Sequence, residues 1–251
     1  MSRLPRTTRA GVSSLDWLDE RVGAGKQVRF FLWRKVPAGT DWFSTMGVAA
    51  LFAFGNQVFT GIFLAMFYRP SATEAYESVQ HITNDVFLGE FVRGLHKWGA
   101  TVMVVCVFLH MGINFYFGAY KYPRELNWVI GVGLLVLVLS MALTGYLLPF
   151  DQRAFWATSV AVNITSSAPI LGPYVADVLR GGAAFTATTL SRFYAIHMLL
   201  IPGLIIGLLA AHLYLVVKLG TTAPPWIKAE TARELAEQDV TAVPATRKVN
   251  G

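Results

Sequence analysis

Four long apolar stretches constrain the fold of this chain more than any other feature of its 251 residues. They run over Phe43–Phe67, Phe91–Phe117, Trp128–Leu148 and Arg192–Val217. Each reaches the roughly 20 residues that a helix needs to cross the hydrocarbon core of a bilayer. The composition agrees, because 54% of the residues are hydrophobic and only 14% are charged. The sequence therefore predicts an all-α integral membrane protein with four transmembrane helices.

Two of these stretches carry paired histidines at matching positions. His96 and His110 are 14 residues apart, and His197 and His212 are 15 apart. At about 100° and 1.5 Å per residue, either spacing returns both rings of a helix to nearly one face, roughly 21–22 Å apart in height. Ionisable groups deep in a membrane are costly and are functional by default, although scattered core histidines are the simpler alternative. Arg93 lies on the same face three residues before His96, as an interfacial arginine or as the partner of an anionic ligand group.

Two imidazoles at one level suit bis-histidine haem ligation, which leaves no coordination position open and favours electron transfer. Zinc is the rival metal, but a structural zinc site needs four close ligands and usually includes cysteine. Each level offers two histidines, and the single cysteine, Cys106, lies inside a span. Two haems about 20 Å apart would carry electrons across most of a bilayer core of about 30 Å. A lipid-soluble quinone is the expected electron carrier.

The other two stretches carry glycine pairs with a spacing that repeats the first histidine pair. Gly47 and Gly61 are 14 residues apart, and so are Gly131 and Gly145. Small residues allow membrane helices to pack closely. The same glycines would also let a flat macrocycle lie against the backbone, and the spacing alone leaves both interpretations open.

The residues outside the bundle are predicted to lie at the membrane surface or in solvent. We expect a bundle over residues 43–218, an N-terminal tail and amphipathic surface helix over 1–42, and a flexible tail over 219–251. Gly23 and Gly25 should interrupt the surface helix. Of the 21 lysines and arginines, 15 fall on the side of the termini, so both termini are expected on the negative, cytoplasmic side. The net charge of +6 is thus explained by topology and does not point to nucleic acid.

The connections between the spans carry weaker signals. Residues Ser71–Glu90 are polar and are expected to form a loop with His81 at the surface. Two short amphipathic helices, near Arg153–Val162 and Pro173–Leu179, are expected to rest on the membrane face. Pro202 should kink the last spanning helix, which neighbouring helices tolerate.

Six motifs make the chain resemble the cytochrome b/b6 family, and most of all its short, four-helix form. The motifs are TGIFLAMFYRP, VRGLHKWGA, KYPRELNWVIGVGL, TGYLLPFDQRAFWA, PILGPYVADVLRGG and TLSRFYAIH, within residues 14–226. The resemblance implies a subunit of a quinol:cytochrome c, or plastocyanin-type, oxidoreductase that is not active alone. It also implies partners: a subunit IV-like chain with a PEWY-type loop, a Rieske iron–sulfur protein and a c-type cytochrome, in a dimeric complex.

The resemblance assigns roles by motif. It implies that His96 with His197 ligates a positive-side, low-potential haem b, and that His110 with His212 ligates a negative-side, higher-potential haem b. The family's haem-packing glycines match Gly47, Gly61, Gly131 and Gly145, and its propionate-binding arginine matches Arg93. The wall of the quinol-oxidising pocket matches Phe150, Asp151, Phe155, Pro169, Gly172 and Pro173. Quinol would give one electron to the Rieske protein and the other, through both haems, to a quinone, with protons released on the positive side.

Three departures from the family lie on the negative side. Thr45 stands where the chloroplast type has a cysteine that holds an extra haem, so both haems are expected to be non-covalent. Ile113 and Val217 replace basic residues that the family often has. The negative-side propionates then need other partners, and the candidates by location are Lys26, Arg29 and Lys218.

Two rival functions stay open at this point. One is a dihaem membrane anchor of another respiratory enzyme, which should lack the PFDQRAFW and PILGP segments. The other is a transporter or structural membrane protein with proton-relay histidines. The expected location is a bacterial plasma membrane or a thylakoid-type membrane.

Overall fold

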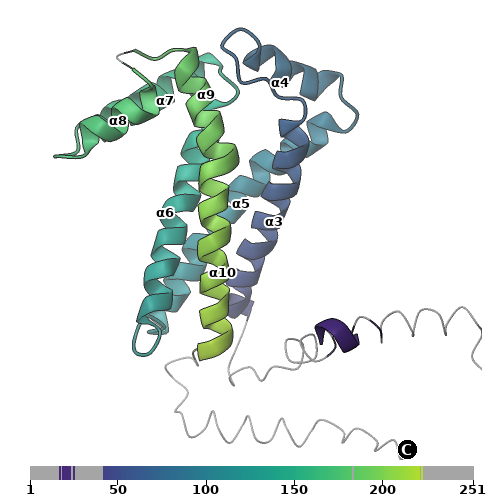
Figure 1. Ribbon diagram of the computed structural model, residues 1–251, viewed down its shortest axis with the longest axis vertical. Coiled ribbons are helices and arrows are strands. Elements are labelled where there is room, and N and C mark those ends of the chain that lie inside the picture. Colours follow the sequence, from purple (N-terminus) through teal and green to yellow (C-terminus); the bar gives the residue numbers. More distant parts are fainter. Residues whose placement is uncertain are drawn as a thin grey trace, which may run out of the picture. The chain divides into compact units, whose positions relative to one another are not determined.

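The computed structural model describes residues 17, 19–23, 25, 42–182, 184–220 and 222. The chain divides into two compact units. One covers Asp41–Pro225, and the other combines Met1–Thr40 with Trp226–Gly251. Within the described residues of the larger unit, all regular elements are helices (Figure 1).

Four long helical runs form the bundle of the larger unit. They are α3 (Met46–Ala65) with the 3-10 turn Trp42–Thr45 before it, α5 (Gly89–Tyr116), α6 (Glu125–Leu147), and a run of α9 (Ala187–Ala195), a π-helical turn (Ile196–Leu200) and α10 (Ile201–Leu219). Each run is long and apolar enough to cross a membrane. The prediction of an all-α membrane domain with four transmembrane helices is therefore confirmed.

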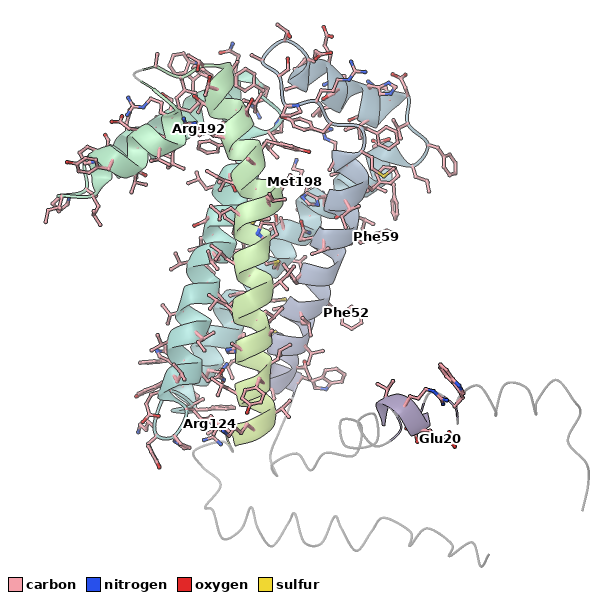
Figure 2. The ribbon with its side chains drawn as sticks, viewed as in Figure 1. Glu20, Phe52, Phe59, Arg124, Arg192 and Met198 are labelled. Carbon is pink, nitrogen blue, oxygen red and sulfur yellow. The ribbon has the colours of Figure 1, made fainter. Side chains whose placement is uncertain are left out.

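The bundle presents large apolar side chains outward and small ones inward. Phe52 and Phe59 project from α3 away from the other helices, with 80% and 75% of their surface exposed (Figure 2). Ala53, Met103 and Val138 form a buried cluster about halfway along α3, α5 and α6. Exposing a large apolar side chain to water costs about 1.5–3 kcal/mol. This surface is therefore suited to lipid.

Short helices cover one end of the bundle, which we call the α4 end (Figure 1). They are α4 (Ala75–Asn84), α7 (Gln152–Ser166) and α8 (Gly172–Arg180). The two short helices predicted before the last span are thus present, with α7 four residues longer than expected. The prediction of a loop over residues 71–90 is wrong for 75–84. The polar composition there hides a helical pattern, because the buried residues Ala75, Ser78, Val79 and Ile82 recur at helical spacing.

The opposite end, which we call the Arg124 end, holds the α5–α6 turn and the end of α10 (Figure 2). The Arg124 guanidinium donates hydrogen bonds to the carbonyls of Leu219 at 3.3 Å and Gly220 at 3.4 Å. The last carbonyls of a helix have no intrahelical donor, and a cation there complements the helix dipole. Arg124 therefore fastens the α5–α6 connection to the last spanning helix.

A π-helical turn precedes Pro202, where the sequence predicted a kink. Proline lacks an N–H, and its ring presses on the carbonyl four residues earlier in an α-helix. In the turn Ile196–Leu200 the N–H of Ile201 instead bonds the carbonyl five residues back. A π turn holds one residue more than an α turn. The 15 residues from His197 to His212 therefore cover about the rise and rotation of 14 α-helical residues.

In the smaller unit, residues 19–22 are helical and Gly23 ends this turn with a φ of +63°. The Gly23 N–H donates to the Asp19 carbonyl at 2.8 Å, as at a helix C-terminus. Gly23 thus interrupts the helix as predicted, whereas Gly25 is itself helical. The rest of the predicted surface helix lies outside the described residues.

Candidate functional site

The structure brings the four histidines together in two pairs inside the bundle. The ring centres of His96 and His197 are 6.5 Å apart, with ring planes inclined by 71°. Those of His110 and His212 are also 6.5 Å apart, with ring planes inclined by 79°. We call them the α4-side pair and the Arg124-side pair, after the nearer end of the bundle.

The separation within each pair fits one metal ion between two imidazoles. Bonds from a metal to an imidazole nitrogen are about 2.0–2.1 Å long. A nitrogen lies about 1.15 Å from the centre of a five-membered ring with bonds of about 1.35 Å. Linear ligation by two rings therefore needs ring centres about 6.3–6.5 Å apart, and both pairs meet this requirement. Among the described residues, no three His, Cys, Asp or Glu side chains gather as a metal site, so a zinc-type cluster is not formed there.

Each histidine ring faces a glycine on a neighbouring helix. The contacts are Gly61 with His96, Gly47 with His110, Gly145 with His197, and Gly131 with His212. A Cβ added to these glycines would lie between 2.6 Å, at Gly145, and 3.5 Å, at Gly131, from the Cε1 atom of the histidine. The glycine pairs therefore leave room for the imidazoles themselves. This contact specifies the two interpretations that the sequence left open, because small residues here admit the ligand side chains.

The π turn explains how unequal spacings match. Gly131 and Gly145 are 14 residues apart on α6, but the histidines that they contact are 15 apart. Because the π turn absorbs one residue, both histidines meet their glycines. On the other side, His96 and His110 are 14 apart and α5 is regular throughout, as are the glycines of α3.

Two threonines that the sequence analysis did not single out contact the α4-side pair. Thr60 Oγ1 lies 2.8 Å from His96 Nδ1, and Thr144 Oγ1 lies 3.1 Å from His197 Nδ1. Each threonine directly precedes one of the site glycines. The repeated Thr-Gly dipeptide, at positions 84 residues apart, was the available signal.

The Arg124-side pair has different neighbours. The side-chain amide of Asn114 lies 3.2 Å from both ring nitrogens of His110 and 2.7 Å from its carbonyl oxygen. His212 lies near the Asn127 backbone carbonyl. Its buried Nδ1 nevertheless makes no hydrogen bond with the described residues, because the geometry of a bond is not met. Asn114 was also missed by the sequence analysis, because it stands one position after the expected arginine site at Ile113.

The other predicted cofactor residues lie at the two ends. The Arg93 guanidinium donates to Thr83 Oγ1 at 3.0 Å, which ties α5 to α4 at the α4 end. Thr45 lies in the 3-10 turn before α3, and its hydroxyl donates to the Trp42 carbonyl at 2.6 Å. Lys218 lies in the last turn of α10, with Nζ 5.8 Å from the ring centre of Tyr214. Lys26 and Arg29 lie outside the described residues.

The predicted pocket residues after α6 are in contact with one another. The Phe150 and Phe155 rings meet edge to face at 6.3 Å. Asp151 begins α7, because its carboxylate accepts a hydrogen bond from the Ala154 N–H at 2.8 Å. Phe150 has a φ of +50°, which is uncommon for a bulky residue and clusters at functional sites. Asp151 therefore has a structural role as a helix cap, whatever else it contacts.

The remaining pocket residues, Pro169, Gly172 and Pro173, lie in and beside the turn between α7 and α8. A Cβ at Gly172 would lie 2.4 Å from the Thr165 carbonyl, so this position requires glycine. Ile170 in the same turn has a φ of +66° and is 85% exposed. The assignment of this turn to a quinol pocket stays a prediction.

Tyr68 joins three segments at the α4 end. Its hydroxyl donates to the Leu148 carbonyl at 2.6 Å, and its ring packs on Tyr194 at 5.5 Å. Burial, and next the neighbouring Tyr194, raise the pKa of Tyr68, so the phenol keeps the proton that it donates. The ends of α3 and α6 and the start of the last span are thereby held together.

The chain matches a family model described as cytochrome b/b6/petB over residues 34–220. It is 41% identical over 212 residues to cytochrome b6 of Heliobacterium modesticaldum, a match that covers 84% of this chain and 100% of that protein. It is 40% identical over 217 residues to the menaquinol:cytochrome c reductase cytochrome b subunit of Bacillus subtilis, covering 83% of this chain and 97% of that one. A solved structure titled hyperthermophilic respiratory complex III contains a chain that is 27% identical, with a TM-score of 0.76. That likeness covers 90% of this chain and 64% of the other, so this chain spans just under two thirds of it.

Proposed function

The chain belongs to the cytochrome b/b6 family, as its motifs predicted, and on that premise we propose that it carries electrons from quinol across a membrane through two bis-histidine b haems. Its relatives make it a cytochrome b subunit of the bc/b6f type. One observation carries the proposal of two haems. The bundle holds two histidine pairs at two levels, each with ring centres 6.5 Å apart.

The residues of the chain fit this cofactor. His96 and His197 would hold the haem nearer the α4 end, and His110 and His212 the haem nearer the Arg124 end. When bound, haem supplies one-electron redox chemistry, and two imidazole ligands leave no site for oxygen. The levels are about 21 Å apart along α5. The apolar cluster of Ala53, Met103 and Val138 lies between them and excludes water.

The orientation of the bundle gives electron transfer its energetic meaning. The excess of Lys and Arg beside the termini supports placing the Arg124 end on the negative side. An electron that passes from the α4 side to the Arg124 side then moves against the membrane potential. This movement stores up to about 2.3 kcal/mol per charge per 100 mV. Quinol oxidation and proton release would take place at the α4 end, beside Phe150 and Phe155.

Arg93 and the pocket residues support this assignment by location. The Arg93 guanidinium lies at the α4 end, where it would pair with a propionate of the nearer haem while it holds Thr83. The positive φ values of Phe150 and Ile170 are of the kind found at functional sites. Thr45 supplies no thiol, so both haems would be bound without a thioether bond.

The partner set follows from the relatives. The Bacillus subtilis relative is named as a subunit of menaquinol:cytochrome c reductase, and the solved relative belongs to a respiratory complex III. We propose a Rieske iron–sulfur protein, a c-type cytochrome and a subunit IV-like chain with a PEWY-type loop as partners, in a dimeric complex. A quinone is the mobile substrate.

Gentle detergent extraction of the complex from its membrane tests this function. We expect these partners to copurify with the chain, together with quinol:cytochrome c reductase activity and a reduced-minus-oxidised haem b band. The His96→Ala variant should lose quinol oxidation, whereas His81→Ala should retain it, because His81 is exposed on α4 and pairs with Asp85 at 3.0 Å. A dihaem complex without quinol:cytochrome c activity would instead support a membrane anchor of another respiratory enzyme. A fully active single subunit would contradict the proposed partner set.

A further inference from the structure

The α4-side histidines have a matched pair of hydrogen-bond partners. Thr60 on α3 contacts His96 Nδ1 at 2.8 Å, and Thr144 on α6 contacts His197 Nδ1 at 3.1 Å. Both threonines are buried, with 1% and 3% of their surface exposed. Each histidine thus meets a hydroxyl at Nδ1 and the following glycine at its Cε1 edge.

The direction of these hydrogen bonds follows from the threonines' other contacts. Thr60 Oγ1 lies 2.6 Å from the Asn56 carbonyl, and Thr144 Oγ1 lies 2.8 Å from the Ser140 carbonyl. A carbonyl only accepts, so each hydroxyl gives its single proton to the carbonyl four residues earlier. The oxygen then has only lone pairs to offer the histidine. Nδ1 of each ring must therefore carry the proton and donate it.

This network selects one tautomer for both rings. With the proton on Nδ1, the lone pair of Nε2 is free for a metal. A ligating histidine that donates its other N–H to an acceptor is held in orientation and becomes a more basic ligand. A more basic ligand stabilises ferric iron more than ferrous iron, and this lowers the reduction potential.

The Arg124-side pair lacks this arrangement. The residues before its glycines are Met46 and Ile130, which have no hydroxyl. His110 instead has the Asn114 amide beside its ring, and His212 Nδ1 makes no hydrogen bond with the described residues. The threonine contacts are therefore specific to one level of the bundle.

We propose that Thr60 and Thr144 are positioning residues that hold His96 and His197 in the Nδ1-protonated tautomer and lower the midpoint potential of the α4-side haem alone. The inference rests on the proposed haem ligation and names the groups that tune one of its two sites. Neither threonine touches the iron, and both act through the histidine ligands.

Redox titration of the purified complex tests the proposal with Thr60→Val and Thr144→Val. Valine keeps the branched shape and removes the acceptor. We expect each variant to raise the midpoint potential of the α4-side haem, with about a tenfold change in the ferric-to-ferrous stability ratio, which is 59 mV for one electron. The potential of the other haem should not move. The electron paramagnetic resonance signal of the α4-side ferric haem should shift in the same variants.

Two further variants make the test specific. Thr60→Ser keeps the hydroxyl and should retain the wild-type potential. Thr101→Val makes the same change on the exposed face of α5 and should alter neither haem. If Thr60→Val loses the α4-side haem altogether, retention of that haem with its normal potential in Thr60→Ser supports the proposal.

Three results would overturn the inference. These are unchanged potentials in both valine variants with two haems present, equal shifts of both haems, or identical behaviour of Thr60→Ser and Thr60→Val. Fewer than two haems in the wild-type complex would instead overturn the proposed function. The two failures are therefore distinguishable.

Discussion

Replacing Gly145 by alanine should remove the haem of the α4-side pair, whereas the same change at Gly131 should leave both haems in place. An added Cβ at Gly145 would lie 2.6 Å from His197 Cε1, against 3.5 Å between Gly131 and His212. Carbon atoms in contact prefer about 3.5–4.0 Å, so His197 would have to move by about 1 Å. A metal site tolerates about 0.2 Å in its ligand distances.

The helix itself gives no reason for this difference. Alanine is favoured over glycine in a helix interior by about 1 kcal/mol, whereas overpacking a filled site costs about 1–3 kcal/mol. The intermediate contacts, 2.9 Å at Gly47 and 3.3 Å at Gly61, predict haem losses in the order Gly145, Gly47, Gly61, Gly131.

Haem content per chain, from reduced-minus-oxidised spectra of purified variants, measures this series. Gly112→Ala is the matched control, because an added Cβ at Gly112 meets nothing within 4 Å. Equal haem loss in all four site variants, or greater loss at Gly131 than at Gly145, would refute the contact argument.

The remaining predictions concern the π turn, the covalent state of the haems and the Arg124 end. Deleting the lipid-exposed Leu199 together with Pro202→Leu should convert the π turn to an α turn and retain both haems, whereas deleting Val105 in the regular α5 should turn His110 by about 100° and lose one haem; spectra showing the reverse would disprove the spacing argument. A denaturing gel stained for haem should show no band for this chain, because Thr45 offers no thiol, and a strong band would refute this. Arg124→Gln should destabilise the protein by about 1–2 kcal/mol through lost hydrogen bonds and dipole interaction, which lowers Tm by about 2–4 °C per kcal/mol in thermal unfolding. The exposed Lys121→Gln is its control, and an unchanged Tm in Arg124→Gln would contradict the capping role.

The spans and the histidine pairing could be predicted because both depend on simple periodicity. An apolar run of about 20 residues has few folds open to it in a membrane. The spacing of His96 and His110 places both rings on one helical face without any knowledge of the neighbours. The four glycines were also visible, as a repeat of that spacing.

Other features depend on contacts between helices and were therefore missed. The polar segment 71–90 hides α4, because its apolar positions are small and alternate with charged residues. Thr60 and Thr144 look like ordinary span residues until α3 and α6 are placed against the histidines. The π turn could not be foreseen from Pro202, since a proline is compatible with a kink as well as with a wider turn.

The central claim is that this bundle holds two haems, each between one histidine of α5 and one of the last span. Haem content with redox titration of single-histidine variants tests it most directly. We expect two haems per chain in the wild type and in His81→Ala. His96→Ala and His197→Ala should lose the same haem, and His110→Ala and His212→Ala should lose the other. A wild type with one haem, or loss of one and the same haem in His96→Ala and His110→Ala, would contradict the account.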